Sequence, residues 1–522
     1  MNYEKFQIMK KLKVIFQNTS MLLLCATVSG TQCVKKNNTK GNNKEKQPNV
    51  IIFAVDDMND WVSPLGYKQA KTPNMDRLAK SGVVFTNAHA PGVFCAPSRT
   101  AIWTGMQAST TGCYDSEPFQ FTHPDVFTMQ MAFKEAGYNT YGAGKLYHHR
   151  GGYVDLRSWD EFFSRSQEHR DMGWEMNSYH MTDVPLPTPH PYSPYYTKSD
   201  REIGSAGHLE WGPIANELED DMVDAMRTNW MCDVIKRKHD KPFFMGLGMY
   251  TPHYPNYAPQ KYFDLYNRDS IELPPLKADD LEDLPEAVRK KQMSRMKQHQ
   301  EIVELGAYKD AVLAYLASIS FADAMLGRVL DALEASPYKD NTIIIFWSDQ
   351  GFHHGEKGHW GKHTLWQRTT QVPFIWTGKG IAKNKRVGTT VSLIDMYPTL
   401  VELCNLSEGK QLDGASLASI LKNPSSAKER NVFIPYMDRG SYAMVNMNWR
   451  YIQYNDNTEE LYNVKDDPNE WDNLANDKKY RPIMDEMKKS APQVFAPSAT
   501  SINDLDLVID GDSFHWVKKD LK

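Results

Sequence analysis

The sequence lacks two features, each of which would point to a class of protein. It has no basic excess, because 60 Lys and Arg stand against 65 Asp and Glu, a formal charge of −5. A protein that binds nucleic acid by neutralising phosphates is therefore not expected. Beyond the first 30 residues there is no apolar run near the roughly 20 residues that span a bilayer, so no transmembrane span is predicted. At 41% hydrophobic and 24% charged residues, the composition is that of a globular protein.

Cysteine is also scarce, with six in 522 residues. Two of the six fall in the first 33 residues, and the remaining four are widely and irregularly spaced: Cys95, Cys113, Cys232 and Cys404. A small disulfide-stapled fold needs a denser and more regular set. No disulfide framework is predicted.

The N-terminus is typical of a secretory signal. Lys10, Lys11 and Lys13 precede a short apolar stretch at 21–28, so residues 1–33 are predicted to be a signal peptide. Residues 34–47 are rich in Lys, Asn and Gly and predict a flexible tether. Cys33, or else Cys25, is a candidate for lipid attachment of the bacterial lipoprotein type, and plain secretion is the alternative. Either way we expect an exported protein in the periplasm or on the surface of a bacterium.

Apolar runs alternate with helical patterns along most of the chain. The predicted strands are 50–55, 83–85, 138–144, 242–250, 343–348 and 372–376, and the predicted helices are 73–81, 128–137, 308–336 and 392–404. This alternation predicts an α/β fold with a large mixed, mostly parallel sheet between layers of helices. After about 405 the pattern changes to short strands at 432–437, 443–447 and 451–454, which predict a smaller C-terminal subdomain (406–522) on an antiparallel sheet.

Acidic residues follow two of the predicted buried strands directly. Asp56 and Asp57 come after the first strand, and Asp349 with Gln350 after the strand at 343–348. Ligands of parallel sheets gather at the carboxyl ends of strands. Carboxylate and amide oxygens suit Ca²⁺ or Mg²⁺ better than zinc. The sequence therefore predicts a divalent cation at this edge, whereas a lone acidic pair would more often be a solvated loop.

The segment Cys95-Ala-Pro-Ser-Arg99, followed by Thr104-Gly105, is the sharpest motif. It places a cysteine at a loop-to-helix junction with Arg99 one turn on. A helix N-terminus lowers a thiol pKa, so a thiolate nucleophile is one interpretation. A buried cysteine beside a capping serine is the other.

This motif resembles the signature of the type I sulfatases. Further segments are similar to that family in the same order, and motifs at 144–148, at 351–366 and around His253 look most like iduronate-2-sulfatase and its bacterial relatives. The matching segments are Asp56-Asp57, 72–79, 144–148, 348–351, 460–463 and 467–474. The resemblance implies an alkaline-phosphatase-like fold and a catalytic domain over 48–405.

The resemblance also implies the chemistry. Cys95 would be oxidised to formylglycine by a maturation enzyme, and the hydrated aldehyde would attack sulfur. The cation, Ca²⁺ or else Mg²⁺, would be held by the oxidised Cys95 and the strand-end residues: Asp56, Asp57, Asp349 and Gln350. Gln350 departs from the Asn or His that the family usually has. Arg99 would stabilise the hydrate.

The family's other positions are matched by two lysines and two histidines. Lys145 and Lys362 would bind the sulfate. His253 would protonate the leaving oxygen and His148 would contact the hydrate, although these two roles are interchangeable. His353, His354, His359 and His363 form a tempting zinc cluster without a tidy ligand spacing. His359 or His363 is a candidate substrate contact, and the others are interpreted as structural or solvated.

The expected substrate is a sulfated oligosaccharide, first a 2-O-sulfated uronic acid of a glycosaminoglycan. Sulfated galactose, hexosamine or an algal polysaccharide unit is the nearest alternative. A two-zinc phosphatase, a formylglycine-type phosphonate or phosphodiester hydrolase and a catalytically inactive glycan-binding module are the rival hypotheses.

Overall fold

The computed structural model describes residues 46–148, 152–163, 209–407, 409, 412–510 and 513–519. The chain divides into two compact units, Met1–Glu45 and Lys46–Lys522. All described residues belong to the second unit. The predicted signal peptide and most of the predicted tether lie outside the described residues, as do residues 164–208.

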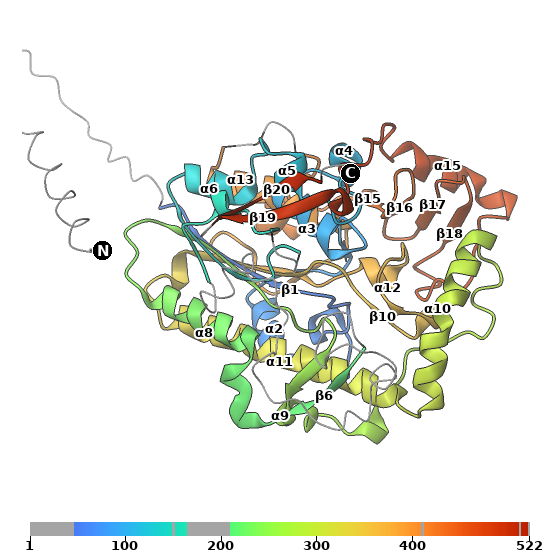
Figure 1. The fold of residues 1–522 in the computed structure, drawn as a ribbon, viewed down its shortest axis with the longest axis horizontal. Helices are drawn as coiled ribbons and strands as arrows, with labels where there is room; N and C mark the ends of the chain where they lie inside the picture. Colours follow the sequence, from blue (N-terminus) through green and yellow to red (C-terminus); the bar gives the residue numbers. More distant parts are fainter. Residues whose placement is uncertain are drawn as a thin grey trace, which may run out of the picture. The chain divides into compact units, whose positions relative to one another are not determined.

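An eight-stranded sheet forms the centre of the second unit (Figure 1). The strands stand in the order β13-β2-β12-β9-β1-β7-β4-β5. They are β1 (Asn49–Val55), β2 (Gly82–Phe85), β4 (Asn139–Gly144), β5 (Glu161–Phe162), β7 (Phe243–Gly248), β9 (Thr342–Ser348), β12 (Phe374–Gly378) and β13 (Lys385–Val387). Strand β12 runs antiparallel to both neighbours, and every other pair is parallel. The predicted mixed, mostly parallel sheet is confirmed.

Strand β1 shows why these strands appear in the sequence as continuous runs of apolar residues. Ile51, Phe53 and Val55 belong to one core, and the alternate residues Val50, Ile52 and Ala54 belong to the other. Side chains alternate across a strand, so a sheet covered on both faces needs apolar residues at every position. Burying each large aliphatic side chain contributes about 1.5–3 kcal/mol.

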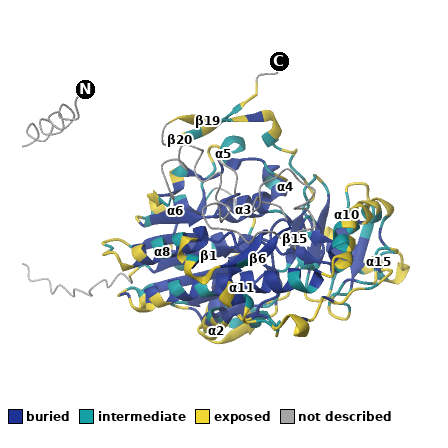
Figure 2. Cartoon of the chain, turned by 60° about the horizontal axis from the view of Figure 1, so that its bottom comes forward, coloured by how far each residue is buried: buried dark blue, intermediate teal, exposed yellow. Residues whose placement is uncertain are grey.

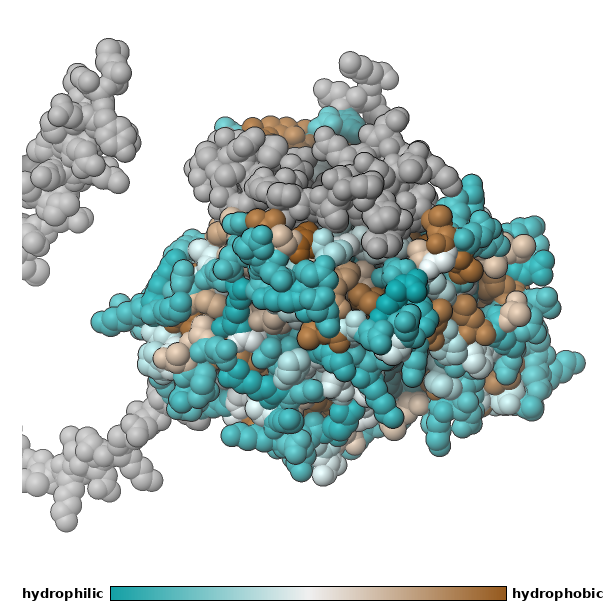
Figure 3. Space-filling model, turned by 90° about the horizontal axis from the view of Figure 1, so that it is seen from below, coloured by the Kyte–Doolittle hydropathy of each residue, from teal (hydrophilic) through white to brown (hydrophobic). Residues whose placement is uncertain are grey.

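Helices cover both faces of the sheet (Figures 1 and 2). The helices of one core are α2 (Pro73–Lys80), α8 (Val223–Lys236) and α11 (Tyr308–Glu334). Those of the other are α3 (Cys95–Thr104), α6 (Met129–Glu135) and α13 (Met396–Cys404). Figure 3 shows hydrophilic side chains over most of one outer face, with apolar residues in scattered groups.

Helix α2 begins where the sequence predicts, but Thr72, a residue type that commonly caps a helix N-terminus, does not cap it. Thr72 occupies the N-cap position without a side-chain capping bond, because its hydroxyl accepts from the Ser63 amide at 3.1 Å. The orphan amides of Asn74 and Met75 instead donate to the Asp323 carboxylate, at 3.1 and 2.7 Å. The cap therefore comes from α11, which fixes α2 against it.

Helix α11 is the one described helix long and apolar enough to cross a membrane. Of its most apolar window, 83% is buried inside the protein. Core helices of this kind pass the same test of length and composition.

The small antiparallel sheet lies after residue 431. Its strands are β15 (Val432–Pro435), β16 (Tyr442–Val445), β17 (Arg450–Gln453) and β18 (Glu459–Tyr462). The first three were predicted and β18 was not. Met484 and Met487 of α15 (Arg481–Lys489) pack on this sheet.

Buried polar contacts fasten this sheet to the loop that follows β9. Lys357 Nζ lies 2.6 Å from the Asp280 carboxylate and donates to the Glu470 carbonyl at 2.7 Å. The Glu470 carboxylate accepts the Gln367 amide at 2.7 Å and pairs with buried Arg450. Removing one member of a buried pair leaves the other charge uncompensated, so these contacts hold the loop firmly.

Candidate active site

Four oxygen-bearing side chains meet at the carboxyl ends of two neighbouring strands. Val55 of β1 pairs with Ser348 of β9, which brings Asp56 and Asp57 beside Asp349 and Gln350. All four are buried. Asp57 has a positive φ of 59°, and its amide donates to Asp349 Oδ1 at 3.3 Å. Non-glycine residues held in this region store strain and cluster at functional sites.

Helix α3 begins at Cys95 and presents the motif to this cluster. Ser98 Oγ donates to the Asp349 carbonyl at 2.6 Å, and Arg99 Nε donates to Asp349 Oδ2 at 2.7 Å. The Thr104-Gly105 part of the motif ends the helix, because Gly105 caps it with φ 72°. The motif is thus one rigid element that joins Cys95 to the Asp349 strand end.

Lys145 and Lys362 both reach Cys95. Lys145 follows Gly144, whose φ is 71° and where an added Cβ would lie 2.0 Å from the Gly248 carbonyl. Its Nζ contacts the Asp56 carboxylate and lies 3.7 Å from Cys95 Sγ. Lys362 Nζ lies 2.7 Å from Asp57 Oδ1 and 2.9 Å from Cys95 Sγ. Two fixed cations therefore flank the cysteine.

The two histidines approach from other loops. His253 Nδ1 lies 2.6 Å from the Tyr254 carbonyl, which only accepts, so Nδ1 carries a proton. Its Nε2 faces Asp57 Oδ2 at 3.5 Å. The His148 ring meets Phe94 edge-on at 5.2 Å between centroids, and Phe94 directly precedes Cys95. The structure thus brings His253 to the acidic cluster and places His148 beside Phe94, one residue before Cys95.

The donor set fits a hard divalent cation. The ligand atoms of Asp56, Asp57, Cys95 and His253 lie within 4.8 Å of one another, the one such cluster among the described residues. Gln350 Nε2 lies 3.4 Å from Cys95 Sγ, whereas its Oε1 is buried without a hydrogen-bond partner in the described part of the chain. A buried carbonyl oxygen without a donor is suited to ligating a cation.

The charged groups shift one another's pKa values. Burial raises the pKa of the Cys95 thiol to about 12, which disfavours the thiolate form of the unmodified cysteine. The carboxylate of Asp56 adds to this effect, whereas the ammonium groups of Lys145 and Lys362 oppose it. Burial also raises the pKa of Asp349 to about 7 against the pull of Arg99. Burial would raise that of Asp56 as well, but Lys145 and the other cations hold it well below its usual range.

The histidines of the loop after β9 do not form a metal cluster. His354 is buried against Tyr315, with ring centroids 3.9 Å apart. His359 Nε2 lies 2.9 Å from the Lys362 carbonyl and His353 Nε2 lies 2.8 Å from Thr364 Oγ1, which are structural contacts. His359 Nε2 is therefore occupied by the Lys362 backbone, and His359 as a substrate contact stays a prediction. The His363 ring packs on Phe94 with centroids 5.0 Å apart.

A hairpin that the sequence did not reveal supports the His148 side of the site. It comprises β19 (Leu505–Asp510) and β20 (Ser513–Lys518). Trp516 Nε1 donates to the Gly152 carbonyl at 2.9 Å, and its ring meets Tyr153 at 6.0 Å. Tyr153 in turn meets the His148 ring at 5.0 Å. The alternating apolar residues of this hairpin were the one signal in the sequence from which its strands could have been predicted.

Two family models match the chain. The model described as Sulfatase matches residues 48–406, about two-thirds of the chain. The model described as N-sulphoglucosamine sulphohydrolase, C-terminal, matches residues 355–495. The chain belongs to the sulfatase family. It is accordingly a sulfuric ester hydrolase, and the predicted family and fold are confirmed. The hairpin of β19 and β20 lies beyond the residues that either model matches.

Relatives and solved structures agree with this assignment. A sulfatase of Formosa agariphila is 36% identical over 461 residues, covering 86% of this chain and 87% of that protein. Human iduronate 2-sulfatase is 28% identical over 375 residues, covering 68% and 64%. The solved structure of a 2-O GAG sulfatase superposes with a TM-score of 0.65 at 23% identity, covering 85% of this chain and 91% of that one.

Proposed function

We propose that this sulfatase hydrolyses sulfate esters of a sulfated glycan outside the cytoplasm of a bacterium, after a maturation enzyme has oxidised Cys95 to formylglycine. The observation that carries the proposal is the surroundings of Cys95 Sγ: Lys145 Nζ at 3.7 Å, Lys362 Nζ at 2.9 Å and the oxygen cluster beside them. The signal-like N-terminus supports export, with or without a lipid at Cys33 or Cys25.

We assign the cation ligands to Asp56, Asp57, Asp349 and Gln350, with the oxidised Cys95 beside them. Ca²⁺ suits this oxygen-rich set, and Mg²⁺ is the alternative. A bound cation would polarise a sulfate oxygen and lower the pKa of the attacking hydroxyl. Arg99 holds Asp349 in place at 2.7 Å.

The remaining residues bind the sulfate and move protons. Lys145 and Lys362 place their ammonium groups where charge develops on the sulfuryl oxygens, and such fixed donors contribute about 2.7–4 kcal/mol each. His253 Nε2 faces the site and would give its proton to the leaving oxygen. Burial lowers the pKa of His253 to about 4, so this step requires the negative charge of the bound ester to raise it. His148 would contact the attacking group.

The leading substrate is a 2-O-sulfated uronic acid of a glycosaminoglycan. The similarity to human iduronate 2-sulfatase supports this choice, and sulfated galactose, hexosamine or an algal unit is the alternative. A fold does not set a substrate, so the choice needs a direct test.

The test is sulfate release from a panel of sulfated sugars with Ca²⁺ present, beside an aryl phosphate. The panel holds 2-O-sulfated uronate disaccharides, 6-O-sulfated and N-sulfated glucosamine, sulfated galactose and ulvan oligosaccharides. We expect cleavage of the 2-O-sulfated uronates. If only another member of the panel is cleaved, the proposed sulfatase chemistry stands and the proposed substrate is wrong. Turnover of the aryl phosphate alone would favour the phosphonate or phosphodiester hydrolase hypothesis.

A further inference from the structure

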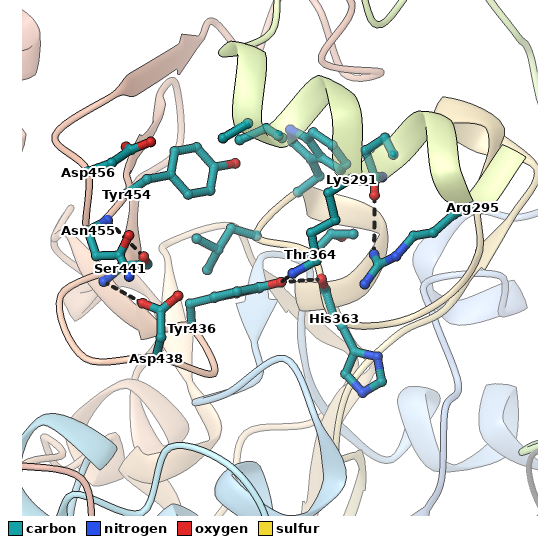
Figure 4. A pocket seen from close by; sticks show the side chains of 15 residues that line it. Lys291, Arg295, His363, Thr364, Tyr436, Asp438, Ser441, Tyr454, Asn455 and Asp456 are labelled. Atoms are coloured by element: carbon teal, nitrogen blue, oxygen red, sulfur yellow. Dashed lines mark hydrogen bonds between the residues drawn. The ribbon is translucent and has the colours of Figure 1, made fainter.

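A cavity of about 140 Å³ lies between the charged helix α10 (Glu286–Glu304), residues 363–366 and the small antiparallel sheet (Figure 4). None of the predicted catalytic residues lines it. Figure 4 shows the two walls: Lys291 and Arg295 project from α10 on one side, and Asp438, Asn455 and Asp456 lie on the other.

The wall formed by α10 carries two cations without an acidic partner. Lys291 Nζ bonds the Tyr436 hydroxyl at 2.6 Å, and Arg295 bonds the neutral Gln292 side chain at 3.2 Å. Among the described residues no carboxylate oxygen lies within 4.0 Å of either cation. Burial lowers the pKa of the Arg295 guanidinium, because desolvation disfavours its charged form. A partly buried, planar guanidinium that faces a cavity and is not paired with a carboxylate of the described residues is suited to binding a sulfate or carboxylate ligand.

The opposite wall of the cavity carries hydrogen-bond acceptors and aromatic side chains, which are suited to binding a sugar ring. Asp438 accepts the Ser441 amide at 3.2 Å, whereas Asp456 accepts both the amide and the hydroxyl of Thr458, at 2.9 and 2.7 Å; both carboxylates retain further lone pairs. Carboxylates accept hydrogen bonds from hydroxyl groups. Tyr436 and Tyr454 add amphipathic aromatic surface between the two walls. The cavity therefore matches a ring that has hydroxyls on one side and a negative charge on the other.

The cavity is joined to the active site through one residue. The Tyr436 hydroxyl donates to the His363 carbonyl at 3.0 Å, and His363 follows Lys362, whose Nζ lies 2.9 Å from Cys95 Sγ. One residue step and one lysine side chain together span on the order of 10 Å. In Figure 4 the His363 ring points away from the cavity, and it packs on Phe94, the residue before Cys95.

We propose that this cavity, the α10 subsite, binds an anionic sugar residue of the glycan other than the one that loses its sulfate. The inference rests on the proposed function and adds that the enzyme selects oligosaccharides with a second sulfate or carboxylate group. Arg295 and Lys291 bind that group, and Asp438 and Asp456 bind ring hydroxyls.

The test compares a long substrate with a short one. For the wild type, kcat/KM is measured with 4-methylumbelliferyl sulfate and with a sulfated tetrasaccharide of the glycan cleaved in the panel. The variants are Arg295→Gln, Arg295→Lys and Lys291→Gln, and the control is Lys290→Gln. Lys290 is the neighbouring exposed lysine, paired with Glu286 at 3.1 Å.

We expect the ratio of tetrasaccharide to aryl sulfate kcat/KM to fall at least tenfold in Arg295→Gln and Lys291→Gln, because hydrogen bonds to charged groups are among the stronger ones. Arg295→Lys should keep part of the ratio, and Lys290→Gln all of it. If the ratio is unchanged in both Gln variants, the α10 subsite is refuted and the proposed function still stands. A wild type that releases sulfate from no glycan would overturn the proposed function, and the inference with it.

Binding provides a second measurement in case a variant folds poorly. The Cys95→Ala protein binds the tetrasaccharide without turnover, and adding Lys291→Gln should raise its Kd at least tenfold. An unchanged Kd would contradict the α10 subsite. Inorganic sulfate is titrated separately: if it competes with the tetrasaccharide equally well with and without Lys291→Gln, the cavity does not recognise the anion.

Discussion

Replacing Gln350 by leucine tests whether this side chain ligates the cation. In the structure Nε2 bonds the Asp57 carboxylate, and Oε1 is buried without a partner among the described residues. Losing the charge-assisted bond costs about 1.5–3 kcal/mol, and removing the unpartnered oxygen offsets about 1–3 kcal/mol. We therefore expect little change in the free energy of unfolding when EDTA is present.

The effect should appear when Ca²⁺ is added. Loss of one oxygen ligand should weaken Ca²⁺ binding at least tenfold, since even outer contacts of metal sites are worth 10- to 100-fold. A tenfold loss is about 1.4 kcal/mol. Titration calorimetry of the Ca²⁺-free proteins measures this difference, and urea unfolding at fixed Ca²⁺ gives the same difference as lost stabilisation.

Gln371→Leu is the matched control. Gln371 Nε2 donates to the Thr86 carbonyl at 3.0 Å, and its Oε1 is also buried without a partner among the described residues. It lies outside the acidic cluster, so its Ca²⁺ affinity should equal that of the wild type. Equal Ca²⁺ affinity of wild type and Gln350→Leu would refute Gln350 as a ligand.

Three further predictions follow from the same geometry. Lys362→Met should lower kcat/KM for an aryl sulfate at least a hundredfold at saturating Ca²⁺, because a fixed donor beside Cys95 is lost; a smaller loss would contradict its role. Burial lowers the pKa of His359 from 6.5 to about 3, so the unfolded chain gains its proton first and stability is lost as pH falls below 6.5. Urea unfolding at pH 5 should show about 2 kcal/mol of this loss, absent in His359→Gln, and an identical pH dependence of the two proteins would contradict it. Trp516→Ala should lower kcat about tenfold by releasing Tyr153 from His148, whereas Trp516→Phe should keep most of it, and equal losses in the two would refute a positioning role.

The cation cluster follows from the sequence for a simple physical reason. Strands β1 and β9 are buried on both faces, so their apolar runs end abruptly where the chain leaves the sheet, at Asp56 and Asp349. Neighbouring parallel strands end at the same edge, which places these residues together. The proximity of these residues can therefore be predicted without knowing the structure of the loops between the two strands.

The lysines and histidines of the site do not follow in this way. Lys145 and Lys362 meet Cys95 across 50 and 267 residues of chain, and each alone looks like a surface lysine. Their positions depend on Gly144 and on the loop after β9, which periodicity does not describe. The resemblance to sulfatases was the source of these residues.

Other features could not be predicted from the sequence, because two physical effects compete at the residue concerned. Helix position favours a Cys95 thiolate, whereas burial raises the thiol pKa to about 12. Thr72 stands where a cap is expected, but the carboxylate of Asp323, far along the chain, takes the amides. The Trp516 hairpin carries no motif of its own, and its contact with Tyr153 depends on the tertiary fold.

Peptide mass spectrometry at Cys95, combined with sulfate release by the same preparations, tests whether formylglycine at this position carries the reaction. Preparations with different fractions of formylglycine are made by varying the maturation enzyme, and each is measured with the cleaved glycan and Ca²⁺. We expect the rate of sulfate release to rise in proportion to the fraction of Cys95 that is converted to formylglycine, and to vanish in Cys95→Ala. A rate independent of conversion, or a fully converted protein that releases no sulfate from any sugar or aryl sulfate, would contradict it.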